Sequence, residues 1–441
     1  MDERGAFREV SIGIKMEFIE NIDKGLSDKD LNTFLYNILN KMKDVKKILI
    51  IHPDYTRVDF TDKIVPVIVK YLKVSGTKKI DFLNAGGTHR KMSEAEILKK
   101  LGLYKKENYL NFYNHEFDNS DNLEVIGKIS SKLVEEKTSG QFTEAIPVTV
   151  NRLILEDYDL IIAISGTVPH EAAGYSGGFK TFFPGISGPE VIDLFHWAAV
   201  LIGIGNIIGT IDNNARDIIN EGSSYIFKKV KAKIVSFNMV NTQEINEVLP
   251  VGLYADSGFN GFINAYKKAA SASSKIHIKY INGNLKQVVQ VIPTYYDEIW
   301  TAGKGSYKLQ RPGVMAKGGE IILYAPHIKC FHSNKIINEQ IISLGYHSKD
   351  KICNLIKSNN KISRNVAAHV INVAGPGVFD KKTNKEKLNF KVTLATGIPE
   401  EVCKSVGLGY RNPETIKKKD YSGSGKLWID EGGKYLYDLK K

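Results

Sequence analysis

The chain has 441 residues, of which 42% are hydrophobic and 25% are charged, and its formal net charge is +12. This composition is typical of a soluble globular protein and excludes a disordered or fibrous chain, and the length predicts two domains. The positive charge suits small anionic ligands, but the lysines are scattered along the chain, so nucleic-acid binding ranks last among the functions considered.

The cysteines indicate a reducing compartment. Cys330, Cys353 and Cys403 lie far apart without a Cys-x-x-Cys pair, which argues against a disulfide framework and a zinc ribbon. The charged N-terminus lacks the apolar core of a signal peptide. The most apolar stretch, 195–211, contains a histidine and three glycines, so we expect a buried helix that runs into a glycine-rich turn rather than a membrane span. These features predict a cytoplasmic protein.

Strands alternate with helices in the first half of the chain. The expected elements, in chain order, are a strand at Lys47–Ile51, a helix at Ile64–Leu72 with Pro66 in its first turn, a strand at Ile80–Leu83, a helix at Glu94–Leu101 opened by a capping box of Ser93 and Glu96, and a strand at Asp159–Ile164. This alternation predicts an α/β architecture with mainly parallel sheets.

The second half contains a further α/β pattern. Strands are expected at Ile276–Ile281, Val288–Ile292 and Glu320–Leu323. We place the domain boundary in the turn that follows Ile281, which gives domains at 1–281 and 282–441; the tail after roughly residue 390 could pack on either domain. The fold class is therefore α/β, with two domains and an active site expected in the cleft between them.

Two loops that follow predicted strands carry similar chemistry. Asp54 and Arg57 lie three residues apart after the first strand, and His89 and Arg90 follow the second strand. Ligands of open α/β sheets gather at the carboxyl ends of strands, and the arginine fork grips a planar carboxylate through two hydrogen bonds. A local ion pair would explain Asp54 and Arg57 alone, but two such loops side by side favour a site.

A glycine-rich segment, 169–181, directly follows the third strand. It holds His170, Ser176 and Lys180 among glycines, which let backbone N–H groups approach a phosphate closely. The segment is one residue short of a phosphate loop between Gly174 and Gly178, which argues against a nucleoside triphosphatase.

A further histidine, His196, follows this segment. Neutral imidazole suits nickel, copper, zinc and iron, but the spacing His-x9-Lys-x15-His from His170 through Lys180 matches no zinc motif. Spacing alone leaves the metal open, and each histidine taken singly is more often a structural residue.

Five motifs together resemble the nickel-dependent lactate racemase family. They follow in the family's order and spacing: Asp54-x-Thr-Arg57, Gly87-Thr-His89-Arg90, Pro169-His170, Gly174-x-Ser-Gly-Gly-x-Lys180-x-x-x-Pro184-Gly185, and His196. The resemblance covers roughly residues 45–200, and a weaker match at 300–304 extends it into the second half.

The resemblance implies a nickel-pincer nucleotide, a nickel pyridinium-3,5-bisthiocarboxylic acid mononucleotide covalently attached through Lys180. His196 matches the nickel ligand. Ser176, Gly177 and Gly178 would lie against the cofactor, and Asp54 would hold Arg57 or the cofactor. Cofactor-synthesis proteins are then expected partners for loading.

The resemblance also implies a mechanism. His89 and His170 match paired histidines that act as general base and acid, one for each enantiomer, and a pKa near 6.5 makes both protonation states accessible. One histidine takes the hydroxyl proton while hydride leaves C2 for the cofactor; return of hydride to the other face of the planar 2-keto acid inverts the centre. Arg57 and Lys304 would hold the substrate carboxylate, and the C-terminal domain would close over the substrate.

The chain departs from the family pattern at the expected substrate site. The lactate enzymes carry Tyr-Gln-x-x-Lys where this chain has Trp300, Thr301 and Lys304, and they carry aromatic residues where Ala172 and Ala173 follow His170 and Glu171 here. These smaller side chains leave room for a substrate longer than lactate, such as an aldonic (sugar) acid, unless Trp300 refills the space.

Three alternatives remain at this point. One is a lactate racemase proper, and another is a non-catalytic nickel or nucleotide binding protein, which would need Lys180, His196 and the glycines but neither His89 nor His170. A dehydrogenase with diffusible nicotinamide is disfavoured because no Gly-x-Gly-x-x-Gly follows a strand with an acidic residue some 20 positions on. A racemase or epimerase of 2-hydroxy acids is the favoured interpretation.

Overall fold

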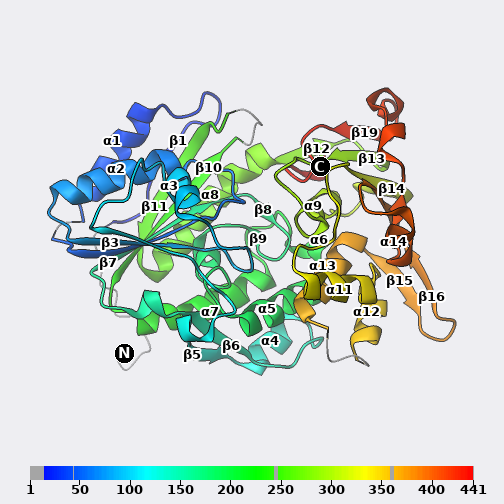
Figure 1. The fold of residues 1–441 in the computed structure, drawn as a ribbon, viewed down its shortest axis with the longest axis horizontal. Helices are drawn as coiled ribbons and strands as arrows, with labels where there is room; N and C mark the ends of the chain where they lie inside the picture. The colour runs from blue at the N-terminus through cyan, green and yellow to red at the C-terminus, as the bar shows by residue number, and fades with distance from the viewer. Residues whose placement is uncertain (1–13, 43, 243–246, 358–361, 441) are drawn as a thin grey trace. The chain divides into compact units, whose positions relative to one another are not determined.

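The protein is an α/β protein of two compact units, described by a computed structural model for residues 14–42, 44–242, 247–357 and 362–440 (Figure 1). The first unit comprises residues up to 195 together with 211–276. The second unit comprises 196–210 and the residues from 277 onward. Within the described ranges, no helix is both long and apolar enough to cross a membrane.

A seven-stranded, mainly parallel sheet forms the centre of the first unit. Its strand order is β1 (Glu17–Glu20), β11 (Pro250–Ser257), β10 (Lys233–Asn241), β7 (Leu160–Gly166), β2 (Lys47–His52), β3 (Lys79–Asn84) and β4 (Leu110–Tyr113). The five strands from β10 to β4 pair in parallel, and only β11 runs antiparallel to its neighbours. The expectation of a mainly parallel sheet is confirmed.

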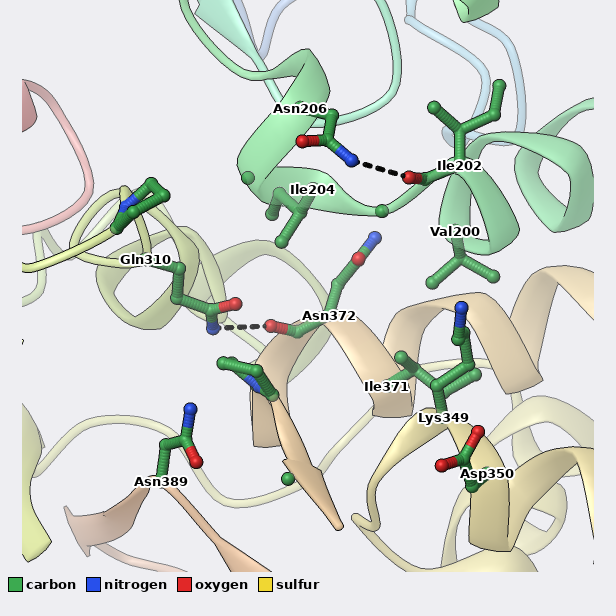
Figure 2. Close-up of a pocket in the computed structure, with 16 residues that line it drawn as sticks. Val200, Ile202, Ile204, Asn206, Gln310, Lys349, Asp350, Ile371, Asn372 and Asn389 are labelled. Atoms are coloured by element: carbon green, nitrogen blue, oxygen red, sulfur yellow. Dashed lines mark hydrogen bonds between the residues drawn. The ribbon is translucent and has the colours of Figure 1, made fainter. Parts of the chain in front are cut away.

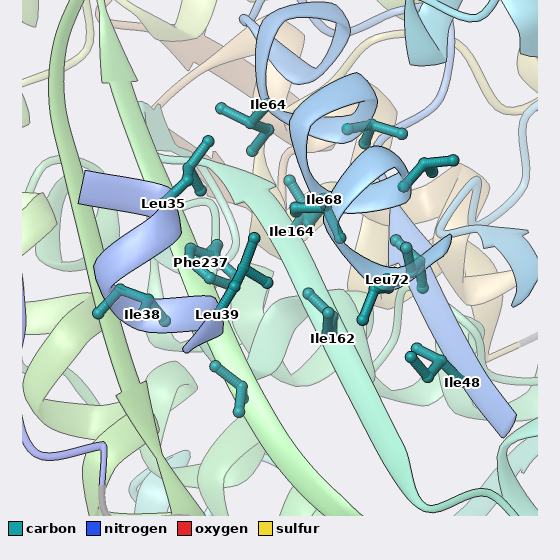
Figure 3. Close-up of a cluster of buried hydrophobic side chains, with 14 of the residues drawn as sticks. Leu35, Ile38, Leu39, Ile48, Ile64, Ile68, Leu72, Ile162, Ile164 and Phe237 are labelled. Atoms are coloured by element: carbon teal, nitrogen blue, oxygen red, sulfur yellow. The ribbon is translucent and has the colours of Figure 1, made fainter. Parts of the chain in front are cut away.

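Helices cover both faces of this sheet, which explains the continuous apolar runs of its strands. On one face, α1 (Asp28–Leu39) and α2 (Thr61–Val74) pack against β2, β7 and β10 (Figure 3). Ile48 and Ile50 of β2 belong to this core, whereas Leu49 and Ile51 are equally buried and, by strand alternation, point to the opposite face. On that side α8 (Gly258–His277) packs against β10 and β11.

The two helices predicted in the first unit differ in how well their starts were predicted. Ser93 and Glu96 form the expected capping box, and α3 spans Glu94–Leu101 as predicted. By contrast, α2 starts at Thr61, so Pro66 lies in its second turn rather than its first. The prediction was wrong because the helix begins three residues earlier than expected, at Thr61. The Asp59 carboxylate stabilises this start by accepting hydrogen bonds from the backbone N–H and the hydroxyl of Thr61.

The remaining elements of the first unit surround the loops after β7. They are α4 (Ser131–Lys137), α7 (Asn214–Lys229), the start of α5 (Pro189–Ile202), and the hairpins β5 (Leu123–Ile129) with β6 (Ile146–Asn151) and β8 (Pro169–His170) with β9 (Gly174–Tyr175).

A five-stranded sheet forms the centre of the second unit, and all its strands are parallel. Its order is β18 (Gly409–Tyr410), β17 (Phe390–Thr396), β14 (Met315–Ala325), β13 (Leu285–Val291) and β19 (Lys426–Ile429). Two small sheets pair β12 (Ile278–Ile281) with β20 (Leu436–Leu439) and β15 (Gly377–Asp380) with β16 (Lys385–Leu388).

The helices of the second unit are short. They are α6 (Ile204–Ile207), α9 (Ile299–Ala302), α10 (Lys304–Tyr307), α11 (Lys335–Leu344), α12 (Lys349–Ile356), α13 (Arg364–Ala374) and α14 (Glu400–Ser405). Of these, α9 follows β13 and α11 follows β14, so both connections leave the carboxyl edge of the sheet, where ligands of such sheets bind.

Candidate functional site

The loops after β2 and β3 bring a histidine onto a buried carboxylate. Nδ1 of His89 lies 2.6 Å from Oδ2 of Asp54, and the other carboxylate oxygen accepts hydrogen bonds from the backbone (2.8 Å) and hydroxyl (2.6 Å) of Thr56. The carboxylate therefore fixes Nδ1 as the protonated nitrogen of a neutral His89. Within the described part of the chain, Nε2 of His89 makes no hydrogen bond, so this nitrogen can accept a proton.

The charges around Asp54 keep this carboxyl ionised. Burial raises the pKa of Asp54, but the charge and hydrogen bond of His89, the charge of Arg57 and the Thr56 hydroxyl outweigh it and hold the pKa well below its ordinary value. The guanidinium of Arg57 makes no hydrogen bond or ion pair with the residues that the structure describes. Its N–H donors are thus available to an anionic ligand beside His89.

The loop after β7 folds back on itself as a two-residue hairpin. Pro169 and His170 of β8 pair with Tyr175 and Gly174 of β9. The Ser176 hydroxyl donates to the Gly166 carbonyl at 2.7 Å and accepts from the Val168 backbone N–H at 3.0 Å. The structure therefore gives Ser176 a role in closing this loop, while its predicted cofactor contact stays a prediction.

His170 is buried at the edge of this hairpin. Its Nδ1 accepts a hydrogen bond from the Ala172 backbone N–H at 3.2 Å and lies 3.4 Å from the Glu171 carboxylate. In the neutral ring, acceptance at Nδ1 places the proton on Nε2. In their neutral forms the two histidines thus differ in tautomer: His170 carries its proton on Nε2, whereas His89 carries its proton on Nδ1.

Gly177 and Gly178 form the turn that leads into a 3₁₀ helix at Gly178–Thr181. Both have positive φ angles of 85° and 57°. A Cβ on Gly177 would lie 2.9 Å from Oγ1 of Thr167, and one on Gly178 would lie 2.9 Å from Tyr266. Only glycine fits at these positions. The Thr167 hydroxyl next to this turn is buried without a hydrogen-bond partner among the described residues.

A buried arginine, Arg216 of α7, holds the carbonyls of this loop. Its guanidinium donates to the carbonyls of Ala173 (2.9 Å), Tyr175 and Gly177 (3.3 Å) and stacks 3.9 Å over the ring of Tyr266. Arg216 is not predicted from the sequence, because a charged residue on a helix normally faces solvent. The Arg216 fork fixes the backbone from which Lys180 projects.

Lys180 lies in an environment that favours its neutral amine. Burial lowers the pKa of Lys180, and with the positive charges of Arg57 and Arg216 acting against the opposing carboxylates of Glu171 and Asp54 the pKa comes to about 7. The amine makes no hydrogen bond within the described residues. Arg57 and Asp54 after β2 therefore share one electrostatic environment with Lys180 and Glu171 after β7, so these two loops form one candidate site.

A second buried polar residue supports the same turn from the sheet. Asn238 of β10 accepts from the Gly178 backbone N–H at 2.8 Å and from the Ser165 hydroxyl at 3.1 Å. Asn238 was not predicted as a supporting residue either, although an asparagine inside an apolar strand indicates a buried polar group that needs a hydrogen-bond partner. Both missed residues act on the loop rather than on a ligand.

His196 lies on α5 and is partly buried; it is the first residue of the second unit. Among the residues that the structure describes, no three His, Cys, Asp or Glu side chains gather to hold a metal by themselves. A metal at His196 would therefore need ligands from a bound group.

The other predicted substrate residues of the second unit lie on α9 and α10. Trp300 stacks on His369, with ring centroids 4.4 Å apart, and the Thr301 hydroxyl donates to the Glu298 carbonyl at 3.0 Å. The Lys304 ammonium lies 4.6 Å from the ring centre of Tyr296. The glutamine of the lactate enzymes is thus replaced here by a hydroxyl that bonds its own helix.

The second unit also contains a cavity of about 460 Å³ between the ends of α5, α6 and α13 (Figure 2). Isoleucines and prolines share its lining with the amides of Asn372 and Gln310 and with Lys349. The lining includes none of the predicted site residues, so we do not assign catalysis to this cavity.

Comparison with known proteins identifies relatives of the first half of the chain. Residues 19–203 match the family model for the lactate racemase N-terminal domain. The lactate racemase of Thermoanaerobacterium thermosaccharolyticum is 30% identical over 177 residues, which are 40% of this chain and 38% of that protein. The lactate racemase of Lactiplantibacillus plantarum is 29% identical over 150 residues, which are 34% of this chain and 32% of that protein.

Solved structures match nearly the whole chain. A protein from Thermotoga maritima is 51% identical, with a TM-score of 0.91 over 96% of this chain and 100% of that chain. The lactate racemase apoprotein of Thermoanaerobacterium thermosaccharolyticum is 19% identical, with a TM-score of 0.64 over 95% of this chain and 91% of that chain. At this identity the latter likeness shows a shared fold.

Proposed function

Because the chain belongs to the lactate racemase family, we propose that it is an isomerase that inverts C2 of a 2-hydroxy acid through a planar 2-keto acid. The observation that carries this proposal is the pair of Asp54 and His89, whose 2.6 Å contact leaves Nε2 as a proton acceptor beside Arg57. A carrier of nickel or nucleotide would have no need of a base oriented in this way.

The two histidines divide the proton transfers. His89 Nε2 takes the proton of the C2 hydroxyl of one enantiomer, and Asp54 stabilises the imidazolium that forms, as a buried carboxylate does for a catalytic histidine. His170, when protonated on both ring nitrogens with its positive charge balanced by the nearby Glu171, gives its Nε2 proton to the oxygen as the other enantiomer forms, and takes the proton back in the reverse direction. A reaction that runs in both directions requires such a matched pair.

We propose that Arg57 binds the substrate carboxylate, a role that the family resemblance also implies for Lys304. Arg57 offers two parallel N–H donors and thereby fixes the plane of the carboxylate. With this plane fixed, C2 can change configuration while the rest of the substrate stays bound.

The residues present fit a nickel-pincer nucleotide. When bound, this group supplies reversible acceptance of hydride from C2. Lys180 has an amine whose pKa of about 7 leaves a substantial fraction of it unprotonated and available for covalent attachment near neutrality. The orphaned Thr167 hydroxyl and the glycine turn offer polar contact and close backbone approach, and His196 would be the one protein ligand to nickel. Loading would need the cofactor-synthesis proteins as partners.

We further propose a substrate longer than lactate, of the aldonic acid class. Small residues, Ala172 and Ala173, follow the catalytic His170, and the Thr301 hydroxyl replaces a longer amide. The alternative is lactate itself, which would make no use of the smaller side chains at these positions.

The test of the cofactor is intact-mass spectrometry with metal analysis on protein purified from a host that has nickel and the cofactor pathway. We expect an adduct on the wild-type chain that Lys180→Ala removes, and nickel that His196→Ala loses while the adduct remains. Lys137→Ala, at a lysine outside the site, is the control. A wild-type chain from the loaded host with neither adduct nor nickel would overturn the proposal.

A further inference from the structure

The arginine that follows His89 is engaged by the helix that its own loop leads into. Nη1 and Nη2 of Arg90 donate to the two carboxylate oxygens of Glu96, at 3.1 and 2.7 Å, and Nη1 also donates to the Lys91 carbonyl at 2.9 Å. Two parallel hydrogen bonds to a carboxylate fix the plane of a guanidinium as well as its position. Arg90 shares a motif with His89, but the proposed proton transfers give it no role.

Glu96 is itself held at the start of α3. Its carboxylate accepts hydrogen bonds from the backbone N–H of Ser93 at 2.8 Å and from the Ser93 hydroxyl at 3.1 Å, as part of the capping box. The hydrogen bonds from Arg90 and from the Ser93 backbone lower the pKa of Glu96 to about 2. The start of the helix therefore presents Arg90 with a fixed anion at neutral pH.

The guanidinium of Arg90 covers the ring of Tyr55, which comes from the neighbouring loop after β2. Cζ of Arg90 lies 4.2 Å from the ring centre, which is a cation–π contact. The same tyrosine ring meets the imidazole of His89 edge-to-face, with ring centroids 6.4 Å apart and an interplanar angle of 61°. Tyr55 thus contacts both His89 and the arginine that follows it.

Successive residues of the two loops therefore pair with each other. Asp54 binds Nδ1 of His89, and Tyr55, the next residue, contacts the rings and guanidinium of His89 and Arg90. The hydrogen bond at Nδ1 constrains only one atom of the imidazole. The orientation of the ring plane, and with it the position of Nε2, depends on a second contact, which Tyr55 supplies.

We propose that Tyr55, held by Arg90 and Glu96, is a positioning residue that sets the ring plane of His89 for proton transfer. The side chains of Arg90 and Glu96 are 57% and 36% exposed, and ion pairs of this kind contribute little to stability. Their loss should therefore affect the reaction more than unfolding. The inference rests on the proposed function and adds to it the residues that hold the base.

The kinetic test measures C2 inversion of a six-carbon aldonate and of lactate by loaded protein. Tyr55→Leu should lower kcat about tenfold, because Nε2 is no longer held in place, while KM changes by less than about twofold. Tyr55→Phe keeps the ring and should restore kcat. Glu96→Gln keeps the capping box but weakens the hold on Arg90, so we expect a smaller loss in the same direction.

A matched arrangement before β4 serves as the control. The Lys73 ammonium pairs with Glu107 at 2.6 Å and lies 5.4 Å from the ring centre of Tyr109. Tyr109→Leu and Glu107→Gln should leave kcat unchanged. Equal losses of kcat in Tyr109→Leu and Tyr55→Leu would overturn the positioning role, since any loss of a tyrosine paired with a cation would then have the same effect.

NMR of cofactor-free protein with ¹⁵N-labelled histidine separates failure of this inference from failure of the proposed function. The Nδ1 proton of His89, in its short bond to Asp54, should give a downfield signal that is absent from His89→Gln. We expect the signal to broaden or shift in Tyr55→Leu, to return in Tyr55→Phe and to persist in Tyr109→Leu. An unchanged signal in Tyr55→Leu would overturn the positioning role. The expected pattern in a protein that, once loaded, inverts no 2-hydroxy acid would support the contact and contradict the isomerase.

Discussion

At the scale of single residues, the Asp54–His89 contact is the arrangement on which proton transfer depends. We predict that Asp54→Asn lowers kcat by a hundredfold or more, because an amide no longer fixes the tautomer of His89 or stabilises its imidazolium. The measurement is the rate of C2 inversion by variant protein whose cofactor content, checked by intact mass, equals that of wild type.

The same loop offers a matched control. Like Asp54, Asp59 is buried and accepts hydrogen bonds from the backbone N–H and the hydroxyl of the threonine two residues later, Thr61. Unlike Asp54, its other partner is Lys100 rather than a histidine. Asp59→Asn should lower stability while kcat changes less than threefold. Equal losses of kcat in Asp54→Asn and Asp59→Asn would mean that Asp54 is merely structural.

The sequence predicted these residues unevenly. The order of the family's motifs predicted Asp54, Arg57, His89, His170 and Lys180 as site residues. In the structure, Asp54, Arg57, His89 and Lys180 are joined by contacts or by a shared electrostatic environment. Arg216 could not be predicted from the sequence. Its role is to donate hydrogen bonds to three backbone carbonyls, and these come together only in the folded chain.

At the scale of elements, the loop between β7 and α5 depends on support from a distant helix. We predict that Arg216→Lys lowers the free energy of unfolding by about 2 kcal/mol or more, since one ammonium cannot serve carbonyls that a planar fork reaches together. Attachment of cofactor at Lys180 should fall as well, as measured by the adduct fraction in intact-mass spectra.

Arg152→Lys is the control for this prediction. Arg152 also donates to a backbone carbonyl, that of Leu123 at 2.9 Å, but its side chain is largely exposed. The change should cost no more than about 0.5 kcal/mol. If both variants unfolded alike and loaded alike, Arg216 would not hold the loop.

Most elements were predictable because their patterns are local. The strand at Lys47–Ile51 corresponds to β2, and α3 has its predicted bounds. The strand expected at Ile276–Ile281 begins only at Ile278, since the end of α8 continues through His277. Helix and strand are hard to distinguish there because the β12 pairing partner, β20, lies at the far end of the sequence.

At the scale of the whole molecule, stability should depend on histidines that fold in the neutral form. Burial lowers the pKa of His52 and of His115 to about 4, and that of His369 to about 3. The unfolded chain binds protons at these groups below about pH 6.5 while the folded chain does not, so their stabilising contribution is present above that pH and is lost as the pH falls.

We therefore predict that the melting temperature falls between pH 7 and pH 5. At pH 5, each of these histidines should lower the free energy of unfolding by roughly 2 kcal/mol. Most carboxylates stay ionised between pH 7 and pH 5, so they contribute little to the change. Differential scanning calorimetry at the two pH values checks this prediction. A melting temperature that is constant or higher at pH 5 would show that these histidines are protonated in the folded protein.

The grouping of 196–210 with the C-terminal residues illustrates what a sequence leaves undetermined at this scale. The apolar stretch there was expected as a buried helix and a glycine-rich turn, and α5 does end at Ile202 before Gly203, whose φ is 97°. The stretch packs with residues that are remote in the sequence: Ile208 belongs to the same hydrophobic cluster as Ile278 and Leu436. The sequence alone therefore does not predict the core to which the stretch belongs.

The central claim is inversion at C2 with internal return of hydride. The direct measurement is NMR of loaded protein incubated with one C2 epimer of an aldonate that carries deuterium at C2. We predict that the other epimer forms and keeps the deuterium at C2 while the hydroxyl proton exchanges with water. An epimer that loses the deuterium to solvent would contradict hydride transfer, and no inversion of any 2-hydroxy acid by protein shown to be loaded would contradict the isomerase itself.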